Sequence, residues 1–350
     1  MKVCVLGATG LVGAELLDLI PRAWPGAALE LFASRAQELT HQGKRYAVRA
    51  AADLEKADAP RGDLAFVALD DEHSARYVPR LLELGYRVVD KSNTYRGDPK
   101  VPLVVAGVNC DLVPASRLVA NPNCTTIPLA MVLQVLRQRW GLEDVIVSTY
   151  QAVSGAGKAT LVDFLEGSKS GYARVTGTGD LVGTSHDTGA YVANTVPHNG
   201  KTDDSGFSAE ERKLMFETRK ILAFEGLPIS AQCCRVPVAV GHYETVWLRL
   251  REPASLKEIE QALGGSRWID LFPGSEGSGL TALATVQRRD RALAGRLRRD
   301  PRGPDGRAFC LTVAGDNLRL GAATNAVRVA SRWIAAADAE LGLAEMKAAS

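Results

Sequence analysis

The chain opens with Lys2-Val3-Cys4-Val5-Leu6, continues through Gly7-Ala8-Thr9-Gly10-Leu11-Val12-Gly13 and enters an amphipathic segment, residues 14–20. An apolar run, a glycine turn and an amphipathic segment in this order predict a strand, a tight turn and a helix. Gly7 permits the turn, Gly10 lets backbone N–H groups approach a pyrophosphate, and Gly13 lets the helix pack closely on the strand. The pattern predicts a dinucleotide-binding domain whose residues 7–13 contact the cofactor.

The end of the second predicted strand indicates which nicotinamide cofactor binds. Domains of this type that prefer NAD place an acidic residue there to hold the ribose hydroxyls. Here the strand Leu29-Glu30-Leu31-Phe32-Ala33 is followed by Ser34 and Arg35. A guanidinium suits a 2′-phosphate, so we expect NADP(H), with Ser34 and Arg35 as contacts. The alternative is that Arg35 is a solvated surface side chain.

One cysteine stands between a strand and a helix. Asn121-Pro122-Asn123-Cys124 follows the apolar run 117–120 and precedes a predicted helix over residues 126–140, for which Thr125 and Thr126 are the expected caps. The dipole and unpaired N–H groups of such a helix N-terminus favour the thiolate, the nucleophilic form of cysteine. Cys124 is therefore the predicted nucleophile, with a buried structural cysteine as the alternative.

A histidine far along the chain is the predicted partner of this cysteine. It ends the segment Arg235-Val236-Pro237-Val238-Ala239-Val240-Gly241-His242. Imidazole gives and takes protons near neutrality. A thiolate beside an imidazole in a dinucleotide-binding chain predicts an enzyme that interconverts an aldehyde and an activated acyl group. The other histidines lack such a setting and are expected on the surface or in packing: His41, His73, His186 and His198.

Length and composition limit the classes of protein. The chain has 350 residues, of which 46% are hydrophobic and 23% charged, with a net charge of +2, and this length suggests about two domains. No apolar run is long enough to span a membrane, and a strand that begins at Lys2 leaves no room for a signal peptide. The weak net charge and the interrupted basic cluster Arg288–Arg299 predict no nucleic-acid partner and no membrane partner.

Cysteine usage predicts the compartment and the absence of a metal site. Six cysteines without a CxxC pair favour a reducing, cytoplasmic setting over a disulfide framework. Cys233 and Cys234 are adjacent in a predicted strand and would point to opposite faces, so we expect no metal.

The organisation of the chain changes near residue 126. Before it, strands over residues 63–69 and 86–90 flank a helix over 74–84, which favours a parallel sheet. After it, strands over 144–150 and 242–250 suit a mixed or antiparallel sheet with one face on helices and the other free to meet a partner subunit.

Capping boxes mark two helices of this later region. Ser208-Ala209-Glu210-Glu211 opens a helix to about Ala223, and Ser255-Leu256-Lys257-Glu258 opens one to about Leu263. Residues 168–195, rich in Gly, Ser and Thr, are expected to form a long loop. The predicted architecture is α/β, with an N-terminal Rossmann-type dinucleotide-binding domain followed by an α+β catalytic and dimerisation domain. The predicted boundaries are 1–125 with 322–350 for the first and 126–321 for the second.

Several motifs occur in the order found in one enzyme family. They are the glycine turn, Asn121-Pro122-Asn123-Cys124, the segment 148–157 that contains Gln151, the helix segment 210–222, Arg235–His242 and the tail 315–325. Over nearly its whole length the chain resembles aspartate-semialdehyde dehydrogenase. The resemblance implies conversion of L-4-aspartyl phosphate and NADPH to aspartate semialdehyde, phosphate and NADP, on the route to lysine, threonine and methionine, by a homodimer or homotetramer.

The resemblance also implies the roles of the site residues. Cys124 would be the nucleophile, His242 the general acid/base, and Gln151 would orient the thioacyl intermediate. Arg235 would hold the substrate α-carboxylate through a bidentate pair, and Glu210 would meet its α-ammonium. The other implied contacts are Arg96, Asn123 and Lys213 to phosphate and Asn325 to the nicotinamide.

Other interpretations stay open at this stage. Glu210 and Lys213 lie three apart on a helix, where such a pair is often only a solvated ion pair. Asp70-Asp71-Glu72-His73 forms an acidic cluster that departs from the family pattern, near the expected path of the cofactor. N-acetyl-gamma-glutamyl-phosphate reductase shares the chemistry, but its substrate has no free ammonium for Glu210. A catalytically silent NADP-binding regulator would not need Cys124, His242 and Arg235.

Overall fold

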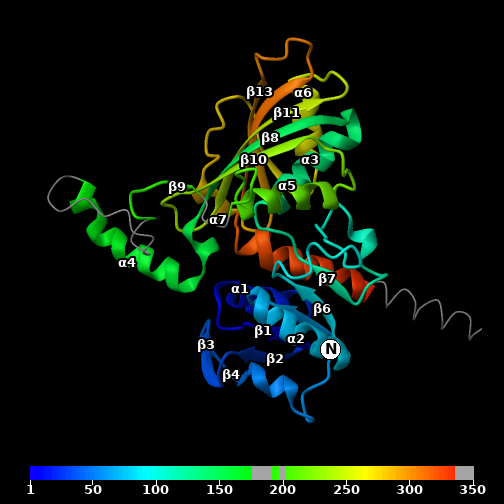
Figure 1. The fold of residues 1–350 in the computed structure, drawn as a ribbon, viewed down its shortest axis with the longest axis vertical. Helices are drawn as coiled ribbons and strands as arrows, with labels where there is room; N and C mark the ends of the chain where they lie inside the picture. Colours follow the sequence, from blue (N-terminus) through cyan, green and yellow to red (C-terminus); the bar gives the residue numbers. More distant parts are fainter. Residues whose placement is uncertain (176–190, 198–201, 336–350) are drawn as a thin grey trace, which may run out of the picture. The chain divides into compact units, whose positions relative to one another are not determined.

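The computed structural model describes residues 1–175, 191–197 and 202–335. Its backbone divides into two compact units (Figure 1). One comprises Met1–Pro122 together with the segment from Ala322 onward, and the other comprises Asn123–Gly321.

The first unit is built on a sheet with the strand order β3-β4-β2-β1-β5-β6-β7. Neighbouring strands run parallel except in the β3–β4 hairpin. Burial of nearly all of β1 and β5 explains their continuous apolar sequences, because a parallel sheet is covered on both faces. The elements are β1 Lys2–Leu6, α1 Leu11–Ala23, β2 Ala28–Ala33, β3 Gln37–His41, β4 Lys44–Ala50, β5 Leu64–Val67, α2 Asp71–Glu83, β6 Arg87–Asp90 and β7 Leu118–Ala120.

The glycine turn between β1 and α1 has no space for side chains at two of its positions. Gly7 has φ +94°, and a Cβ there would lie 2.5 Å from the carbonyl oxygen of Ala68. A Cβ on Gly13 would lie 2.4 Å from the carbonyl oxygen of Gly7. Gly10 occupies the N-cap of α1 without a side-chain cap. The predicted strand, turn and helix are confirmed, and the helix begins at Leu11, three residues earlier than expected.

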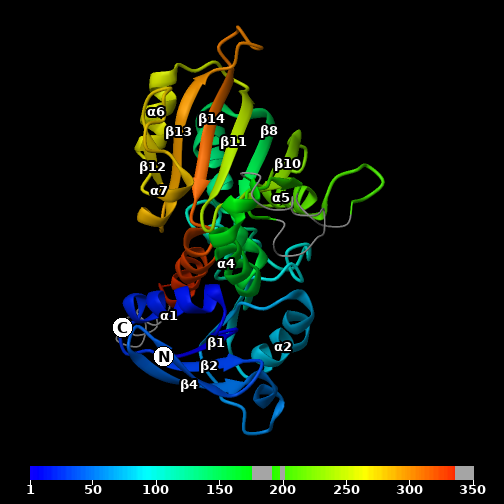
Figure 2. The same cartoon turned by 90° about the vertical axis from the view of Figure 1, so that its left-hand side faces the viewer.

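The second unit is built on a mixed sheet with the order β12-β13-β14-β11-β8-β10-β9, whose central strands Figure 2 shows side by side. Along β8, β10 and β11 buried residues alternate with more exposed ones, so one face is the core face and the other is open. The strands are β8 Leu142–Gln151, β9 Val196–Pro197, β10 Ile229–Arg235, β11 His242–Leu250, β12 Ile269–Phe272, β13 Ala292–Arg299 and β14 Ala308–Gly315.

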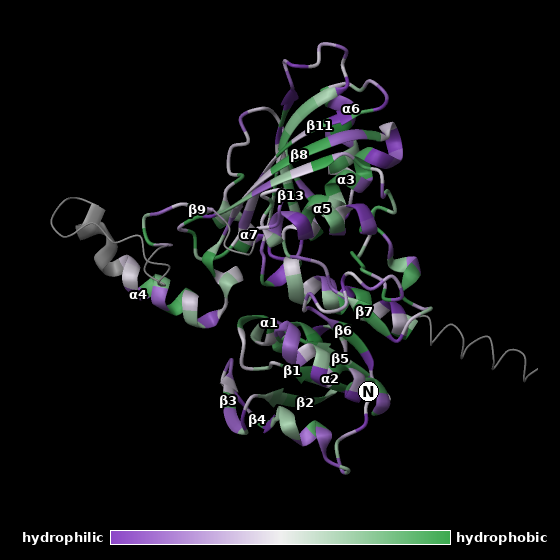
Figure 3. Cartoon of the chain, in the orientation of Figure 1, coloured by the Kyte–Doolittle hydropathy of each residue, from purple (hydrophilic) through white to green (hydrophobic). Residues whose placement is uncertain are grey.

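The α-helices described in this unit are α3 Thr126–Trp140, α4 Lys158–Val175, α5 Ala209–Ile221, α6 Leu256–Gly264 and α7 Ala282–Gln287. The helix α3 is hydrophobic over most of its length (Figure 3), and nine of its residues are buried. Both predicted capping boxes are confirmed, at Ser208 for α5 and at Ser255 for α6.

Thr125 occupies the N-cap position of α3, but the predicted capping by the hydroxyls of Thr125 and Thr126 is wrong. Thr125 has helical backbone angles, φ −77° and ψ −38°, rather than the extended conformation that lets an N-cap hydroxyl reach back to the helix. Both hydroxyls are buried and have no hydrogen-bond partner among the described residues. The first turn closes through the Ile127 N–H, which donates to the Asn123 carbonyl at 3.2 Å. Cys124 therefore lies in the turn that leads into α3.

Two other local expectations change. Residues 168–175 belong to α4 and do not form a loop. The apolar periodicity before them favours a helix that continues beyond Gly167. Residues 176–190 lie outside the described part of the chain. The acidic cluster at 70–73 forms the start of α2. Asp70 caps this helix by accepting from the His73 N–H at 3.0 Å, and Asp71 accepts from the Asn93 N–H at 2.7 Å. The cluster thus has a local structural role.

Candidate functional site

Strand topology in the second unit brings three candidate residues to one edge of the sheet. Gln151 ends β8, Arg235 ends β10 and lies opposite it, and His242 begins β11, the other neighbour of β8. Because β8 and β10 are parallel and β11 is antiparallel to β8, these ends share the same edge. Cys124, from the turn before α3, meets this edge.

The nucleophile candidate and the histidine are in direct contact. Cys124 Sγ lies 3.1 Å from His242 Nε2 and 3.3 Å from Asn123 Oδ1. The imidazole is fully buried, while the thiol is partly exposed. A Cβ on Gly321 would lie 2.7 Å from the Cys124 Cβ, so only glycine leaves space beside the nucleophile.

Four of the other five cysteines are poor nucleophiles by comparison. Burial raises the pKa of the Cys233 thiol to about 12. Burial also raises the pKa of Cys4, Cys234 and Cys310 above the ordinary cysteine value. Since the thiolate is the reactive form, these thiols are protonated at neutral pH and unreactive.

Ala152, which directly follows Gln151, forms hydrogen bonds with the side chains of both His242 and Arg235. The backbone N–H of Ala152 donates to His242 Nδ1 at 2.9 Å, and its carbonyl accepts from an Arg235 guanidinium nitrogen at 2.6 Å. A Cβ on Gly155 would lie 2.9 Å from that Arg235 nitrogen and 3.4 Å from His242 Cε1 and Nε2. The segment 152–155 therefore holds Arg235 and His242 in fixed positions.

A buried acidic group lies on the α5 side of the site. Glu210 accepts from Asn123 Nδ2 at 2.6 Å, from Gln151 Nε2 at 3.3 Å and from Lys213 Nζ at 2.7 Å. The structure thus brings four predicted substrate or catalytic residues together, with Glu210 as their common acceptor. Lys213 and Glu210 form an ion pair in which Glu210 is buried and Lys213 is partly exposed.

Two residues of the site were not found by sequence reasoning. Glu217 is buried and accepts from the Asn123 N–H at 2.6 Å. This hydrogen bond fixes the peptide group between Pro122 and Asn123. Asn317 accepts from the Gly241 N–H at 2.9 Å and donates to Ser154 Oγ at 2.9 Å, so it joins the loops before His242 and after Gln151. Glu210 and Glu217 lie seven residues apart, which is two turns of the helix. This spacing was the sequence signal that could have identified Glu217.

The remaining predicted residues belong to the first unit. Arg96 is buried and donates to the carbonyls of Asn121 and Lys91 at 3.0 and 2.6 Å. Asn325 is fully buried in the helix formed by residues 325–335; it accepts from the Ala106 N–H at 2.8 Å and donates to Asn121 Oδ1 at 2.8 Å. Ser34 and Arg35 are exposed at the end of β2.

A buried carboxyl lies two residues beyond the histidine on β11. Glu244 is fully buried, and neither of its oxygens has a hydrogen-bond partner within the described ranges. Burial raises the pKa of this carboxyl well above its ordinary value. The folded protein therefore holds a proton on Glu244 more tightly than the unfolded chain does.

The raised pKa of Glu244 predicts how the free energy of unfolding depends on pH. Because the folded state binds the proton more tightly, Glu244 makes unfolding easier as pH rises above the unfolded glutamate value of about 4.3. We expect Glu244→Gln to raise the free energy of unfolding at pH 8 and to flatten its pH dependence. Urea unfolding at pH 5 and pH 8 measures both, with the exposed Glu276→Gln as control. A variant as pH-sensitive as the wild type would contradict this account.

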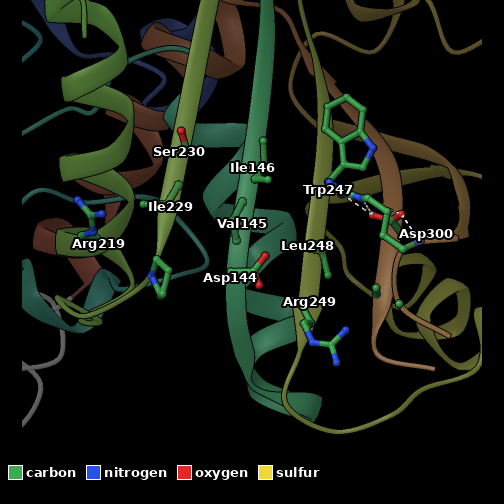
Figure 4. A pocket seen from close by; sticks show the side chains of 14 residues that line it. Asp144, Val145, Ile146, Arg219, Ile229, Ser230, Trp247, Leu248, Arg249 and Asp300 are labelled. Atoms are coloured by element: carbon green, nitrogen blue, oxygen red, sulfur yellow. Dashed lines mark hydrogen bonds and ion pairs between the residues drawn. The ribbon is translucent and has the colours of Figure 1, made fainter. Parts of the chain in front are cut away.

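The hollow in Figure 4 lies away from these residues. It is formed around Asp144 and Ile146 of β8, Ser230 of β10 and Trp247 and Arg249 of β11. By strand register these positions lie toward the opposite ends of the strands that carry Gln151, Arg235 and His242. The hollow is therefore separate from the candidate site.

The described part of the chain offers neither a cluster of metal ligands nor a membrane-spanning helix. His, Cys, Asp and Glu side chains there do not gather in groups of three or more suited to a metal ion. None of the helices in the described ranges combines the length and the apolar character needed to cross a bilayer.

Comparison with known proteins gives a consistent result. Residues 2–114 match the NAD binding domain of semialdehyde dehydrogenases, and residues 133–320 match their dimerisation domain. The aspartate-semialdehyde dehydrogenase of Mycolicibacterium smegmatis is 37% identical over 358 residues, with 94% of this chain and 98% of the relative covered. That of Aquifex aeolicus is 33% identical over 338 residues, with 94% and 96% covered.

A solved structure agrees with these relatives. Aspartate semialdehyde dehydrogenase II of Vibrio cholerae, complexed with ASA, has a TM-score of 0.85 at 31% identity, with 95% of this chain and 98% of that chain covered. The predicted α/β architecture with a Rossmann-type domain and an α+β domain is confirmed. With its cysteine and histidine in contact and both family domains present in order, the chain belongs to the aspartate-semialdehyde dehydrogenase family.

Proposed function

We propose that this chain reduces L-4-aspartyl phosphate to aspartate semialdehyde through a thioester on Cys124. The observation that carries the proposal is the 3.1 Å contact between Cys124 Sγ and His242 Nε2, next to the buried Arg235 and Glu210. A thiolate is a strong nucleophile for an acyl phosphate, and phosphate is a good leaving group. The reaction therefore needs groups that bind the amino acid and groups that handle charge on its reacting oxygen.

The residues of the chain divide this work. Cys124 attacks the acyl carbon, the carbonyl electron pair moves to oxygen, and the bond to phosphate breaks with its electrons leaving on phosphate. His242, the proposed general acid/base, has its Nε2 3.1 Å from the attacking sulfur. Gln151, which lies at the same sheet edge, orients the acyl group.

Two charged residues are proposed to bind the amino-acid end of the substrate. Arg235 presents a planar fork suited to the α-carboxylate, and Glu210 is an anion for the α-ammonium. Glu210 already accepts from Lys213 and Asn123, so an arriving ammonium joins or replaces these donors. Lys213, Asn123 and Arg96 are the proposed phosphate contacts.

The first unit has the features that a nicotinamide dinucleotide requires. Its glycine turn leads into α1, and the positions of Gly7 and Gly13 have no space for a side chain. When bound, the cofactor supplies the hydride that reduces the thioester. We propose NADP(H), held by residues 7–13 with Ser34 and Arg35 at its 2′-phosphate and Asn325 near the nicotinamide.

Arg35 gives the test of cofactor choice. We expect Arg35→Ala to weaken NADP(H) binding by about 10- to 100-fold, because a charged hydrogen bond contributes about 1.5–3 kcal/mol, while NAD(H) binding changes little. Fluorescence titration of each reduced cofactor measures both constants, with Arg22→Ala at the end of α1 as control. Equal weakening for both cofactors, or an NAD preference in the wild type, would contradict the assignment.

The second unit supports an oligomer, as expected of a chain with the family's dimerisation domain. On the open face of its sheet, Ile146 is 44% exposed and Tyr150 36% exposed. Exposed large apolar side chains on a sheet face are suited to a partner surface. We propose a homodimer or homotetramer that forms through this face.

An assay with purified protein separates the candidate functions. We expect NADPH formation from aspartate semialdehyde and NADP that requires phosphate. Higher kcat/KM with N-acetylglutamate semialdehyde would indicate the N-acetyl-gamma-glutamyl-phosphate reductase reaction. No turnover of either, with NADP still bound, would indicate a silent regulator.

A further inference from the structure

We infer that the backbone N–H of Ala152 fixes the tautomer of His242, so that the neutral ring carries its proton on Nε2, facing Cys124. This inference rests on the proposed function and concerns how the histidine serves the reaction. It makes His242 a hydrogen-bond donor to the reacting oxygen when the Cys124 thiolate attacks.

The contact at Nδ1 carries the inference. A backbone N–H can only donate, and that of Ala152 lies 2.9 Å from Nδ1, so Nδ1 acts as an acceptor there. A neutral imidazole with an accepting Nδ1 carries its proton on Nε2. Nε2 is the nitrogen 3.1 Å from Cys124 Sγ, which makes the sulfur the acceptor of that proton.

The opposite orientation of the imidazole ring cannot form the same two hydrogen bonds. Turning the imidazole by half a revolution would place one ring carbon against the Ala152 N–H and another against Cys124 Sγ, and neither carbon can replace a nitrogen in these hydrogen bonds. The ring is fully buried, and Ala152 is itself held, because the next two N–H groups of its loop, on Val153 and Ser154, donate to Val238 and Ala239 at 2.8 and 3.0 Å. The donor therefore has a fixed position.

The imidazolium form is disfavoured for two reasons. Protonation of Nδ1 would set its N–H against the N–H of Ala152. The Arg235 guanidinium and the His242 ring both lie within 3.4 Å of the point where a Gly155 side chain would begin, so a second cation would form beside the first.

The acidic groups Glu210 and Glu244 do not shift His242 from the neutral form to the imidazolium form. Glu210 is paired with Lys213 at 2.7 Å. Burial raises the pKa of Glu244, two residues along β11, which favours the neutral form of that carboxyl. Cys124 Sγ contacts the ring at Nε2, and its thiolate can accept a hydrogen bond from a neutral Nε2–H.

The consequence for catalysis is that His242 acts on the oxygen of the acyl group through Nε2–H. When the thiolate adds to the carbonyl, a bond forms between sulfur and carbon and the π electrons move to oxygen. Nε2–H donates to this oxyanion, which then re-forms the carbonyl as phosphate departs. Ala152 is thus a positioning residue that acts through its backbone.

Nitrogen NMR of histidine-labelled protein tests the tautomer directly. We expect the His242 signals, assigned by their loss in His242→Gln, to show a protonated Nε2 and an unprotonated Nδ1 at neutral pH. A protonated Nδ1, alone or together with Nε2, would overturn the inference. The wild-type turnover of aspartate semialdehyde, measured on the same sample, tests the proposed function separately.

A backbone ester tests the role of Ala152. Replacing Ala152 by lactic acid removes one N–H without a side-chain change, and we expect mixed His242 tautomers and about 10-fold lower kcat, the effect of one ordinary hydrogen bond. The matched control is the corresponding ester at Val153, whose N–H bonds Val238 in the same loop. Equal kcat losses from both esters with an unchanged tautomer would show that the Ala152 bond is only structural and would overturn the inference.

Discussion

Cys124→Ser is expected to abolish nearly all turnover while NADP(H) still binds. A hydroxyl at neutral pH is a far weaker nucleophile than a thiolate, and loss of a nucleophile lowers kcat by about 10⁴- to 10⁶-fold in comparable systems. The cofactor constant should stay unchanged because the glycine turn belongs to the other unit. Steady-state kinetics and fluorescence titration measure the two quantities.

The control for this variant is Cys234→Ser. Cys234 lies on β10 of the same unit, and burial raises the pKa of its thiol. It should keep wild-type kcat. Turnover by Cys124→Ser within about 100-fold of the wild type would contradict a covalent mechanism at this residue.

Arg235→Lys has the second largest expected effect. Lysine keeps the charge but loses the planar fork, and disturbing a buried charged pair costs about 2–5 kcal/mol. We therefore expect kcat/KM for aspartate semialdehyde to fall by about 100-fold or more, whereas exposed Arg267→Lys should have no effect. Glu210→Gln should raise KM for the same substrate and leave cofactor affinity unchanged.

A different pattern would reassign the substrate. If Arg235→Lys lowered kcat/KM by less than threefold, the α-carboxylate would have another partner. If Glu210→Gln left KM unchanged, a substrate without a free ammonium would become the better candidate.

Local patterns in the sequence were sufficient for most of the fold. The alternation along His242–Leu250 matches β11 at both ends, and the serine and glutamate of each capping box start α5 and α6 where expected. The turn before α3 could not be predicted in the same way. Thr125 and Thr126 have the right chemistry for caps, but tertiary packing holds Thr125 in a helical conformation and buries both hydroxyls.

The candidate site shows a similar division. Side chains with distinctive chemistry, such as Cys124, His242 and Arg235, could be identified from motifs, and their meeting follows from strand order. The contacts made by backbone groups could not be identified from residue types. The N–H and carbonyl of Ala152 are the main example, because every residue other than proline carries the same two groups.

The central claim is that Cys124 carries the acyl group. Mass spectrometry of protein incubated with aspartate semialdehyde and NADP, in the absence of phosphate, tests it most directly. We expect one aspartyl thioester per chain, located on Cys124 by peptide mapping and discharged when phosphate is added. An acyl group on another residue, or NADPH formation without any adduct, would contradict it.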